Sequence, residues 1–449
     1  MMGGALYIRE EVLAKGRPYG GSLMHGRAGH RLRLNHTAFE SVKILHGRSL
    51  PEAVKKISAE YGVAEETVRQ DLEPLVRDLL ERGFLIREYQ RRSWYPDLRY
   101  PVESVTLHLT RRCNMSCLHC LVDGGLEEQG ELSTGEWLEV VSQLPQLQIT
   151  CVTLSGGEPL MRRDFFRLAG AIDARHIPMI ICTNGTMING TTVSLLKELN
   201  IKEIQVSLDG ASPGTNDAIR GPGSFTAAIR AIRLLKQAGI RTSIAATLSG
   251  MNIHEYKDIF RLALELGVDG FFSSEILMTG RAKKTGAVLG LDAAAIAAAR
   301  IYYLQQGRLY PQLQMEDEYA RDVMLVDFDF GGGSDTFRKI DMCGAGRASF
   351  VIGPTGEVLP CRGFREGDFP SANVRHEPLS KLWQTAPGIV AFRNLCVDNF
   401  DECSGCAVKY ECGGGCRAFA YALHGRLDGP PDPVTCAWKK RLAEFSKLP

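Results

Sequence analysis

The sequence has almost no net charge, because 53 Lys and Arg side chains are balanced by 52 Asp and Glu side chains. A protein that binds nucleic acid through its bulk surface needs a basic field, so this composition argues against that partner. No apolar run is long enough to cross a bilayer. Charges also interrupt Met1 to Lys15, where a signal peptide would carry its apolar segment. We therefore expect a cytoplasmic protein that binds neither membrane nor nucleic acid.

A disulfide framework is also not expected. The chain has 13 cysteines, but the cytoplasm keeps thiols reduced, so these cysteines indicate metal binding instead. They gather mainly in two regions, one near residue 113 and one from residue 343 onward. With 449 residues, the chain is long enough for several domains and a sizeable core.

The first cysteine group has a Cys-x3-Cys-x2-Cys spacing at Cys113, Cys117 and Cys120, directly after the apolar, β-prone run 105–109. A strand there would deliver the thiols to a loop at its C-terminal end, where βα proteins bind ligands. Three thiolates can ligate three irons of a [4Fe–4S] cluster and leave the fourth iron open. The alternatives are three structural cysteines or half of a zinc site, and spacing by itself does not exclude them.

Between residues 102 and 291, β-prone stretches alternate with amphipathic ones. The expected strands are 105–109, 152–154, 179–182, 203–207, 242–247 and 271–276. The expected helices are 133–144, 164–174, 193–199, 225–238 and 254–266. Six βα repeats predict an α/β fold, a parallel sheet curled into a partial (β/α)6 barrel that is open on one side.

In this context the cysteine motif resembles that of the radical S-adenosylmethionine (SAM) superfamily. The resemblance implies that the open iron chelates the amino and carboxylate groups of SAM, and that an electron from the cluster cleaves SAM to a 5′-deoxyadenosyl radical. It also implies that residues at the strand ends hold SAM: Ser155, Gly156, Gly157, Glu158, Thr183, Asn184, Ser207 and Asp209. In this family the Gly-Gly-Glu segment, including the Glu158 carboxylate, accepts hydrogen bonds from the SAM amino group. Arg220 is a candidate partner for the SAM carboxylate, with a solvated surface arginine as the alternative. His119 takes a usually aromatic position over the cluster, where we expect packing and not iron ligation.

From residue 343 onward we expect sparse regular structure. The spacing of seven cysteines there resembles the SPASM extension of radical SAM enzymes, which implies two auxiliary [4Fe–4S] clusters and three clusters in all. By the family pattern, the outer cluster is held by Cys403, Cys406, Cys412 and Cys436, and the inner one by Cys343, Cys361 and Cys416. Two structural zinc ions are the alternative.

This assignment leaves the inner cluster one ligand short. Cys396 is a candidate for the missing position; otherwise the iron is open and a substrate thiolate can ligate it. Cys151 and Cys182 lie on or beside expected strands and are interpreted as core thiols. The Gly280-Arg281-Ala282 segment looks like a turn that precedes the extension in these relatives.

Residues 1–90 are expected to form a separate module of short strands, at 5–9, 22–25 and 30–34, followed by three helices. The first two helices are predicted to open at Thr37 and Ser49 with capping boxes. The module resembles the PqqD-like domain, which binds an extended leader peptide by strand addition at a sheet edge. A structural cap and a winged-helix DNA reader are the alternatives, and the module lacks the basic recognition helix of the latter.

The remaining segments are a linker at 91–101, a bridging region at 292–342 with a helix at 293–305 and an acidic, Gly-rich loop at 327–336, and the SPASM domain at 343–449. The whole order most resembles the sactipeptide and ranthipeptide maturases, which form cysteine thioether crosslinks in ribosomally made peptides. That resemblance implies a precursor peptide with a leader sequence and an electron donor such as flavodoxin or ferredoxin. No protein acid or base is assigned a catalytic role. The rivals are a maturase that forms carbon–carbon crosslinks, a sulfatase maturase, a DNA-binding iron–sulfur redox sensor and an iron–sulfur electron carrier.

Overall fold

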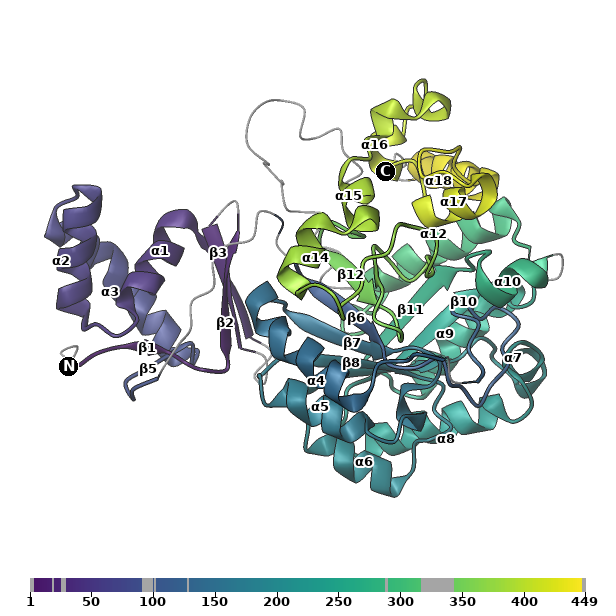
Figure 1. Ribbon diagram of the computed structural model, residues 1–449, viewed down its shortest axis with the longest axis horizontal. Coiled ribbons are helices and arrows are strands. Elements are labelled where there is room, and N and C mark those ends of the chain that lie inside the picture. Colours follow the sequence, from purple (N-terminus) through teal and green to yellow (C-terminus); the bar gives the residue numbers. More distant parts are fainter. Residues whose placement is uncertain are drawn as a thin grey trace.

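The computed structural model describes residues 4–17, 20–25, 30–90, 100, 102–126, 129–286, 290–315 and 343–445. An N-terminal module lies at one end, a barrel built on a parallel sheet lies in the centre, and the C-terminal segment packs beside the barrel (Figure 1). The expected linker lies outside the described residues except for Tyr100, and the acidic stretch 327–336 lies wholly outside them. In the described part, no helix combines the length and apolar character needed to cross a bilayer.

The N-terminal module contains a small antiparallel sheet and three helices. Its strands are β1 (Tyr7–Ile8), β2 (Val12–Arg17), β3 (Gly20–His25), β4 (His30–Asn35) and β5 (Leu85–Ile86), and its helices are α1 (His36–Leu45), α2 (Leu50–Tyr61) and α3 (Glu65–Glu81). The sheet order is β2-β3-β4, and β1 pairs with β5. Strand β2 was not predicted, because Lys15 interrupts its apolar pattern.

The two predicted capping boxes have different outcomes. The one at Ser49 and Glu52 is confirmed, and α2 ends at Gly62 with a left-handed φ of 67°. The one at Thr37 is wrong, because the Asn35 side chain caps α1 by accepting from the Ala38 amide at 2.8 Å.

A buried ion pair fixes this module to the barrel. Lys15 Nζ of β2 lies 3.2 Å from Glu103 Oε1, just before the first barrel strand, and the two side chains are 3% and 4% exposed. The same ammonium group donates to the Val102 carbonyl. In addition, Met24 of β3 packs against Cys151 and Ile180 of the barrel. The module is therefore docked on the ends of the barrel strands opposite to the cysteine loop.

The central sheet confirms the expected α/β fold. Its strands are β6 (Ser104–His108), β7 (Cys151–Ser155), β8 (Met179–Thr183), β9 (Ile201–Ser207), β10 (Thr242–Leu248) and β11 (Gly270–Glu275). All five neighbouring pairs are parallel, in the order β6 to β11. Two strands from the C-terminal segment extend this sheet: β12 (Ser349–Ile352) pairs with β6 in parallel, and β13 (Val358–Leu359) pairs with β12.

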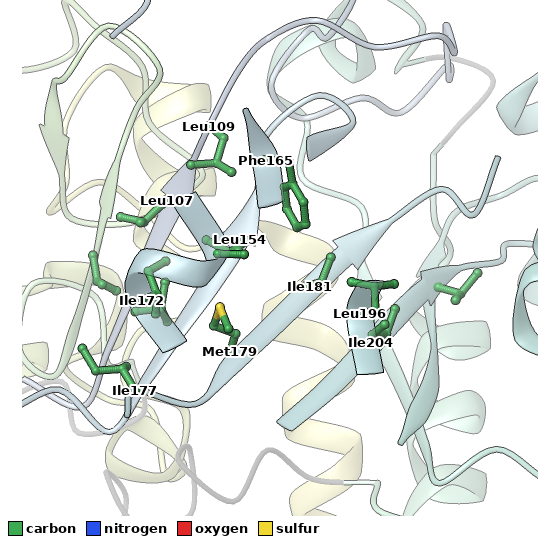
Figure 2. Packing of buried hydrophobic residues seen from close by; sticks show 14 of the residues in the cluster. Leu107, Leu109, Leu154, Phe165, Ile172, Ile177, Met179, Ile181, Leu196 and Ile204 are labelled. Atoms are coloured by element: carbon green, nitrogen blue, oxygen red, sulfur yellow. The ribbon is translucent and has the colours of Figure 1, made fainter. Parts of the chain in front are cut away.

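Helix α7 (Pro213–Arg220) lies between β9 and α8, and α10 (Gly280–Lys284) and α12 (Ala293–Leu309) follow β11. One face of the sheet is covered by α4 (Thr134–Gln143), α5 (Phe165–Asp173), α6 (Gly190–Lys197), α8 (Ser224–Gln237) and α9 (Tyr256–Glu265). Under them lies an apolar row that includes Leu107, Leu154, Ile181 and Ile204, one residue from each of four neighbouring strands (Figure 2). Helix α7 was not predicted, because it is short and mostly polar.

The C-terminal segment contains more regular structure than expected. Its helices are α14 (Leu379–Thr385), α15 (Pro387–Arg393), α16 (Lys409–Cys412), α17 (Arg417–His424) and α18 (Pro433–Phe445). The expectation of sparse structure was wrong. Four of these helices have only four to eight residues, too few for an apolar period to be recognised, whereas α18 has 13 residues and was missed. Short 3-10 helices occur at η1 (Leu144–Leu147), η2 (Pro159–Met161), η3 (Ile253–Glu255), η5 (Val397–Asn399) and η6 (Asp401–Cys403).

Candidate functional site

The three cysteines of the first group lie in the loop that follows β6. All three thiols are free and partly buried, and Cys113 interacts electrostatically with both Cys117 and Cys120. Burial raises the pKa of the Cys113 thiol to about 11, so the bare chain holds this thiol protonated at neutral pH. A bound metal centre deprotonates such thiols outright. The donor set therefore fits a three-cysteine cluster site better than it fits a reactive thiol.

The Gly-Gly-Glu segment at the end of β7 packs directly on the chain that leads into Cys113. Gly157 N donates to the Thr110 carbonyl at 2.7 Å, and Glu158 N donates to the Arg112 carbonyl at 2.8 Å. Gly156 has a φ of 134°, and a Cβ on it would lie 2.4 Å from Thr110 O. A Cβ on Gly157 would lie 2.3 Å from Arg112 O. Only glycines permit this close approach, which fixes the segment beside the cysteine loop.

The Glu158 side chain is fully buried and is held by protein donors. Its Oε1 accepts from Thr183 Oγ1 at 2.9 Å and from Leu160 N at 3.2 Å, while Oε2 accepts from Asn184 N at 2.7 Å. Burial raises the pKa of Glu158 to about 7 despite these hydrogen bonds. We predicted that this carboxylate accepts hydrogen bonds from the amino group of SAM, and that role stays a prediction. In the structure the carboxylate joins the end of β7 to the end of β8.

Asn184 continues this network to the cysteine loop. Its Nδ2 donates to Asn114 Oδ1 at 2.9 Å and lies 4.0 Å from Cys113 Sγ. Asn114 in turn donates to Thr186 Oγ1 at 2.8 Å. Neither Asn114 nor Thr186 was predicted as a site residue, although Asn114 directly follows the first cysteine. Ser207, another predicted residue, lies at the C-terminal end of β9.

A charged cluster lies just after the C-terminal end of β9. Asp209 is fully buried, and its Oδ2 lies 2.6 Å from Arg220 Nε and 3.2 Å from His119 Nε2. Arg220 is only 8% exposed, so the alternative of a solvated surface arginine is wrong. Burial lowers the pKa of His119 to about 4, which leaves the ring neutral at neutral pH. His119 therefore lies beside Asp209 as well as next to Cys120.

Arg281 was not predicted as a site residue, although its Gly-Arg-Ala turn was identified. Its amide donates to the Cys120 carbonyl at 2.9 Å, and its Nη1 donates to the Cys117 carbonyl at 3.0 Å. Its Nη2 donates to the Gly124 carbonyl. Gly280, with a φ of 61°, lies so close to the loop that a Cβ would be 2.3 Å from Cys120 O. The turn after β11 therefore holds the cysteine loop through the carbonyls of Cys117, Cys120 and Gly124.

The C-terminal cysteines form two groups in space. Cys361 interacts electrostatically with Cys343 and Cys416, and Cys403 interacts with Cys406, Cys412 and Cys436. Burial raises the pKa of both Cys361 and Cys403. In the described part of the chain, no set of three His, Cys, Asp or Glu side chains is arranged to hold a single metal ion. Cys396 directly follows Leu395, and both Leu395 and Cys343 pack against the cluster of Val397, Phe400 and Cys403.

The face of the sheet opposite to the helices carries a row of polar side chains. In the register, His108 pairs with Ser155, and Cys182 pairs with Gln205. Cys182 Sγ lies 3.6 Å from Gln205 Oε1. Arg362, which directly follows Cys361, interacts electrostatically with His108, Cys182 and Cys416. Arg362 therefore connects this polar row with the 343/361/416 cysteine group.

Three family patterns match the chain. The radical SAM superfamily matches residues 107–263, coenzyme PQQ synthesis protein D (PqqD) matches residues 20–85, and the iron–sulfur cluster-binding domain known as SPASM matches residues 343–407. Among curated proteins, mycofactocin maturase MftC of Mycobacterium ulcerans is 32% identical over 73% of this chain and 86% of its own length. An AdoMet-dependent heme synthase of Nitratidesulfovibrio vulgaris is 29% identical over 75% of this chain and 92% of its own length.

Solved structures share the fold. Streptococcus suis SuiB bound to S-adenosylmethionine superposes with a TM-score of 0.70 at 17% identity, over 96% of this chain and 99% of that one. SuiB bound to its precursor peptide SuiA gives a TM-score of 0.69 with the same coverage and identity. At this identity the likeness concerns the fold.

Proposed function

Because the chain belongs to the radical SAM superfamily, as a member with PqqD and SPASM domains, we propose that it forms cysteine thioether crosslinks in a ribosomally made precursor peptide. An enzyme of this class uses SAM and [4Fe–4S] clusters. The observation that carries the peptide proposal is the PqqD-like module, docked on the barrel through the buried Lys15–Glu103 pair. An electron carrier or a redox sensor needs no such module beside a SAM site.

The ligands are proposed as follows. Cys113, Cys117 and Cys120 hold the cluster that binds SAM and supplies the electron for its cleavage. Ser155 to Glu158, Thr183, Asn184 and Ser207 line the SAM site, with Glu158 acting through its hydrogen bonds to Thr183 and Asn184. Asp209 and Arg220 form a buried pair beside His119, where Arg220 retains further donors for the SAM carboxylate.

The peptide would bind across two domains. An extended leader would add a strand at an edge of the β2-β3-β4 sheet. The modified part would lie over the polar row of the barrel, between the SAM site and the inner cluster held by Cys343, Cys361 and Cys416. A peptide thiolate could complete that cluster, which would place its sulfur near the carbon that loses hydrogen. The outer cluster would be held by Cys403, Cys406, Cys412 and Cys436.

A carbon–carbon crosslink is the second candidate product. It uses the same SAM site and needs no peptide thiolate on the inner cluster. Cys396 as the fourth inner ligand would favour this product, because the iron would then be closed to substrate. A cytoplasmic location, with flavodoxin or ferredoxin as electron donor, accompanies both proposals.

The test uses the full-length enzyme, reconstituted without oxygen, with SAM and the short Cys-containing peptide encoded beside its gene. Each thioether crosslink lowers the mass of the peptide by two hydrogens relative to the precursor. The crosslinked cysteine also no longer reacts with iodoacetamide. A peptide with Cys→Ser substitutions should be left unmodified. Loss of hydrogen from that peptide would instead establish the carbon–carbon product. A Cys396→Ala enzyme that loses its inner cluster would also refute ligation by a peptide thiolate.

A further inference from the structure

Arg417 is a buried arginine whose charge interacts with cysteines of both C-terminal groups. It is the first residue of α17, directly after Cys416, and is only 1% exposed. It interacts electrostatically with Cys416 and Cys343 of one group and with Cys403 and Cys412 of the other. A single side chain thus acts on both groups.

Backbone carbonyls and an aromatic ring hold the guanidinium in place. Nη1 donates to the carbonyls of Gly429 at 2.8 Å and Leu427 at 3.2 Å, and Nη2 donates to the Gly414 carbonyl. The guanidinium lies 4.6 Å from the centre of the Phe400 ring. Gly414 has a φ of 78°, and a Cβ there would lie 2.6 Å from that ring. The glycine run before Cys416 therefore lets the loop close around the guanidinium.

The hydrogen-bond partners of the Arg417 guanidinium are neutral backbone carbonyls. Within the described residues, no Asp or Glu oxygen is in ion-pair contact with Arg417, and Asp428 has a weaker effect on it than Cys403, Cys416 and Cys412 have. A buried charge without a counter-charge is costly. The groups placed to balance it are the cysteines, which carry negative charge when they ligate iron.

We propose that Arg417 is a positioning residue whose charge raises the reduction potentials of both auxiliary clusters. This rests on the proposed assignment of the two cysteine groups to two clusters. A fixed positive charge favours the state that holds the additional electron, and net charge and hydrogen bonding are established determinants of cluster potential. The residue would thereby keep both clusters able to accept the electron left after bond formation.

The test is a redox titration followed by electron paramagnetic resonance. The full-length chain carries Cys113→Ala, Cys117→Ala and Cys120→Ala, so that only auxiliary clusters contribute, and iron is counted first. Replacing Arg417 with Gln should leave the iron content unchanged and shift both midpoint potentials to more negative values. Arg417→Lys, which keeps the charge, should return both toward the starting values. Arg426→Gln, which removes a surface charge from the same region, should leave both unchanged.

Unchanged potentials in an iron-replete Arg417→Gln protein would overturn the inference and leave Arg417 with a loop-holding role. A shift of one cluster alone would overturn the shared role. If Arg417→Gln holds no auxiliary iron, Arg417→Lys decides. Clusters restored by lysine support a role for the charge, and their continued absence refutes it. Absence of auxiliary iron from the background protein itself would instead refute the cluster assignment.

Discussion

At the scale of single residues, Arg281 is expected to determine whether the SAM cluster is retained. Its side chain donates to the carbonyls of Cys117 and Gly124, and hydrogen bonds from a charged donor contribute about 1.5–3 kcal/mol each. Arg281→Ala should loosen the loop, so that iron content falls from about twelve toward about eight per chain. Lys283→Ala, an exposed change in the same helix, is the control. Full iron retention in Arg281→Ala would show that the cysteine loop retains its cluster without the Arg281 hydrogen bonds.

Glu158 is expected to make stability depend on pH. Its pKa is raised from 4.5 to about 7 in the folded chain, so the folded state binds more protons than the unfolded state between these values. The free energy of unfolding should therefore fall as pH rises through this window, by up to about 3 kcal/mol, and the contribution is fully present below it. Urea unfolding of the iron-free chain at pH 5 and pH 8 measures this difference.

Glu158→Gln should remove most of that pH dependence, because the glutamine cannot ionise. Glu198→Gln, at an exposed position after α6, should retain it. If Glu158→Gln and the unchanged chain show the same difference between the two pH values, another group carries the effect.

At the scale of elements, the contact between β2 and the start of β6 includes a buried ion pair. Lys15→Met would remove the Lys15 ammonium group from Glu103, and breaking a buried pair in this way costs about 3–5 kcal/mol. We expect the module to undock from the barrel, and faster limited proteolysis of the chain measures this change. The double change Lys15→Met with Glu103→Met should restore much of the docking, because it removes the buried Glu103 carboxylate together with the Lys15 ammonium group. No rescue in the double variant would mean that the pair acts through more than its charges.

The elements also show which features a sequence can predict. The Cys-x3-Cys-x2-Cys loop and the ends of β7 to β9 were located from local signals: cysteine spacing, glycines and β-prone runs. The Arg281 contacts were not, because they join segments that come together only when the barrel closes. The Asp209–Arg220 pair was also missed, although the two residues are close in the sequence. Burial of Arg220 depends on α7, whose short polar sequence gave no helical signal. The role of β12 is likewise determined by its partner β6, far away in the sequence.

At the scale of the whole molecule, we expect three clusters in the protein reconstituted without oxygen. Iron analysis should approach about twelve atoms per chain, the sum for three four-iron clusters. Replacing Cys113, Cys117 and Cys120 with Ala should leave about eight atoms and abolish SAM cleavage. Cleavage of SAM by that triple variant would rule out the assigned SAM site.

The pairing of β12 with β6 makes the C-terminal segment inseparable from the catalytic barrel. Ser349 pairs with Ser104 and Ile352 with Leu107, so the strand that leads to the cysteine loop has its neighbour supplied from about 245 positions later in the chain. Truncating the chain at residue 343, or replacing the segment that follows, would therefore remove the hydrogen bonds between β12 and β6. The exposed edge of β6 would then be prone to aggregation. Evolution or engineering can replace this segment only together with a strand that fits β6. Nascent protein must likewise wait for its last quarter before the sheet is complete, which makes late synthesis a vulnerable stage of folding.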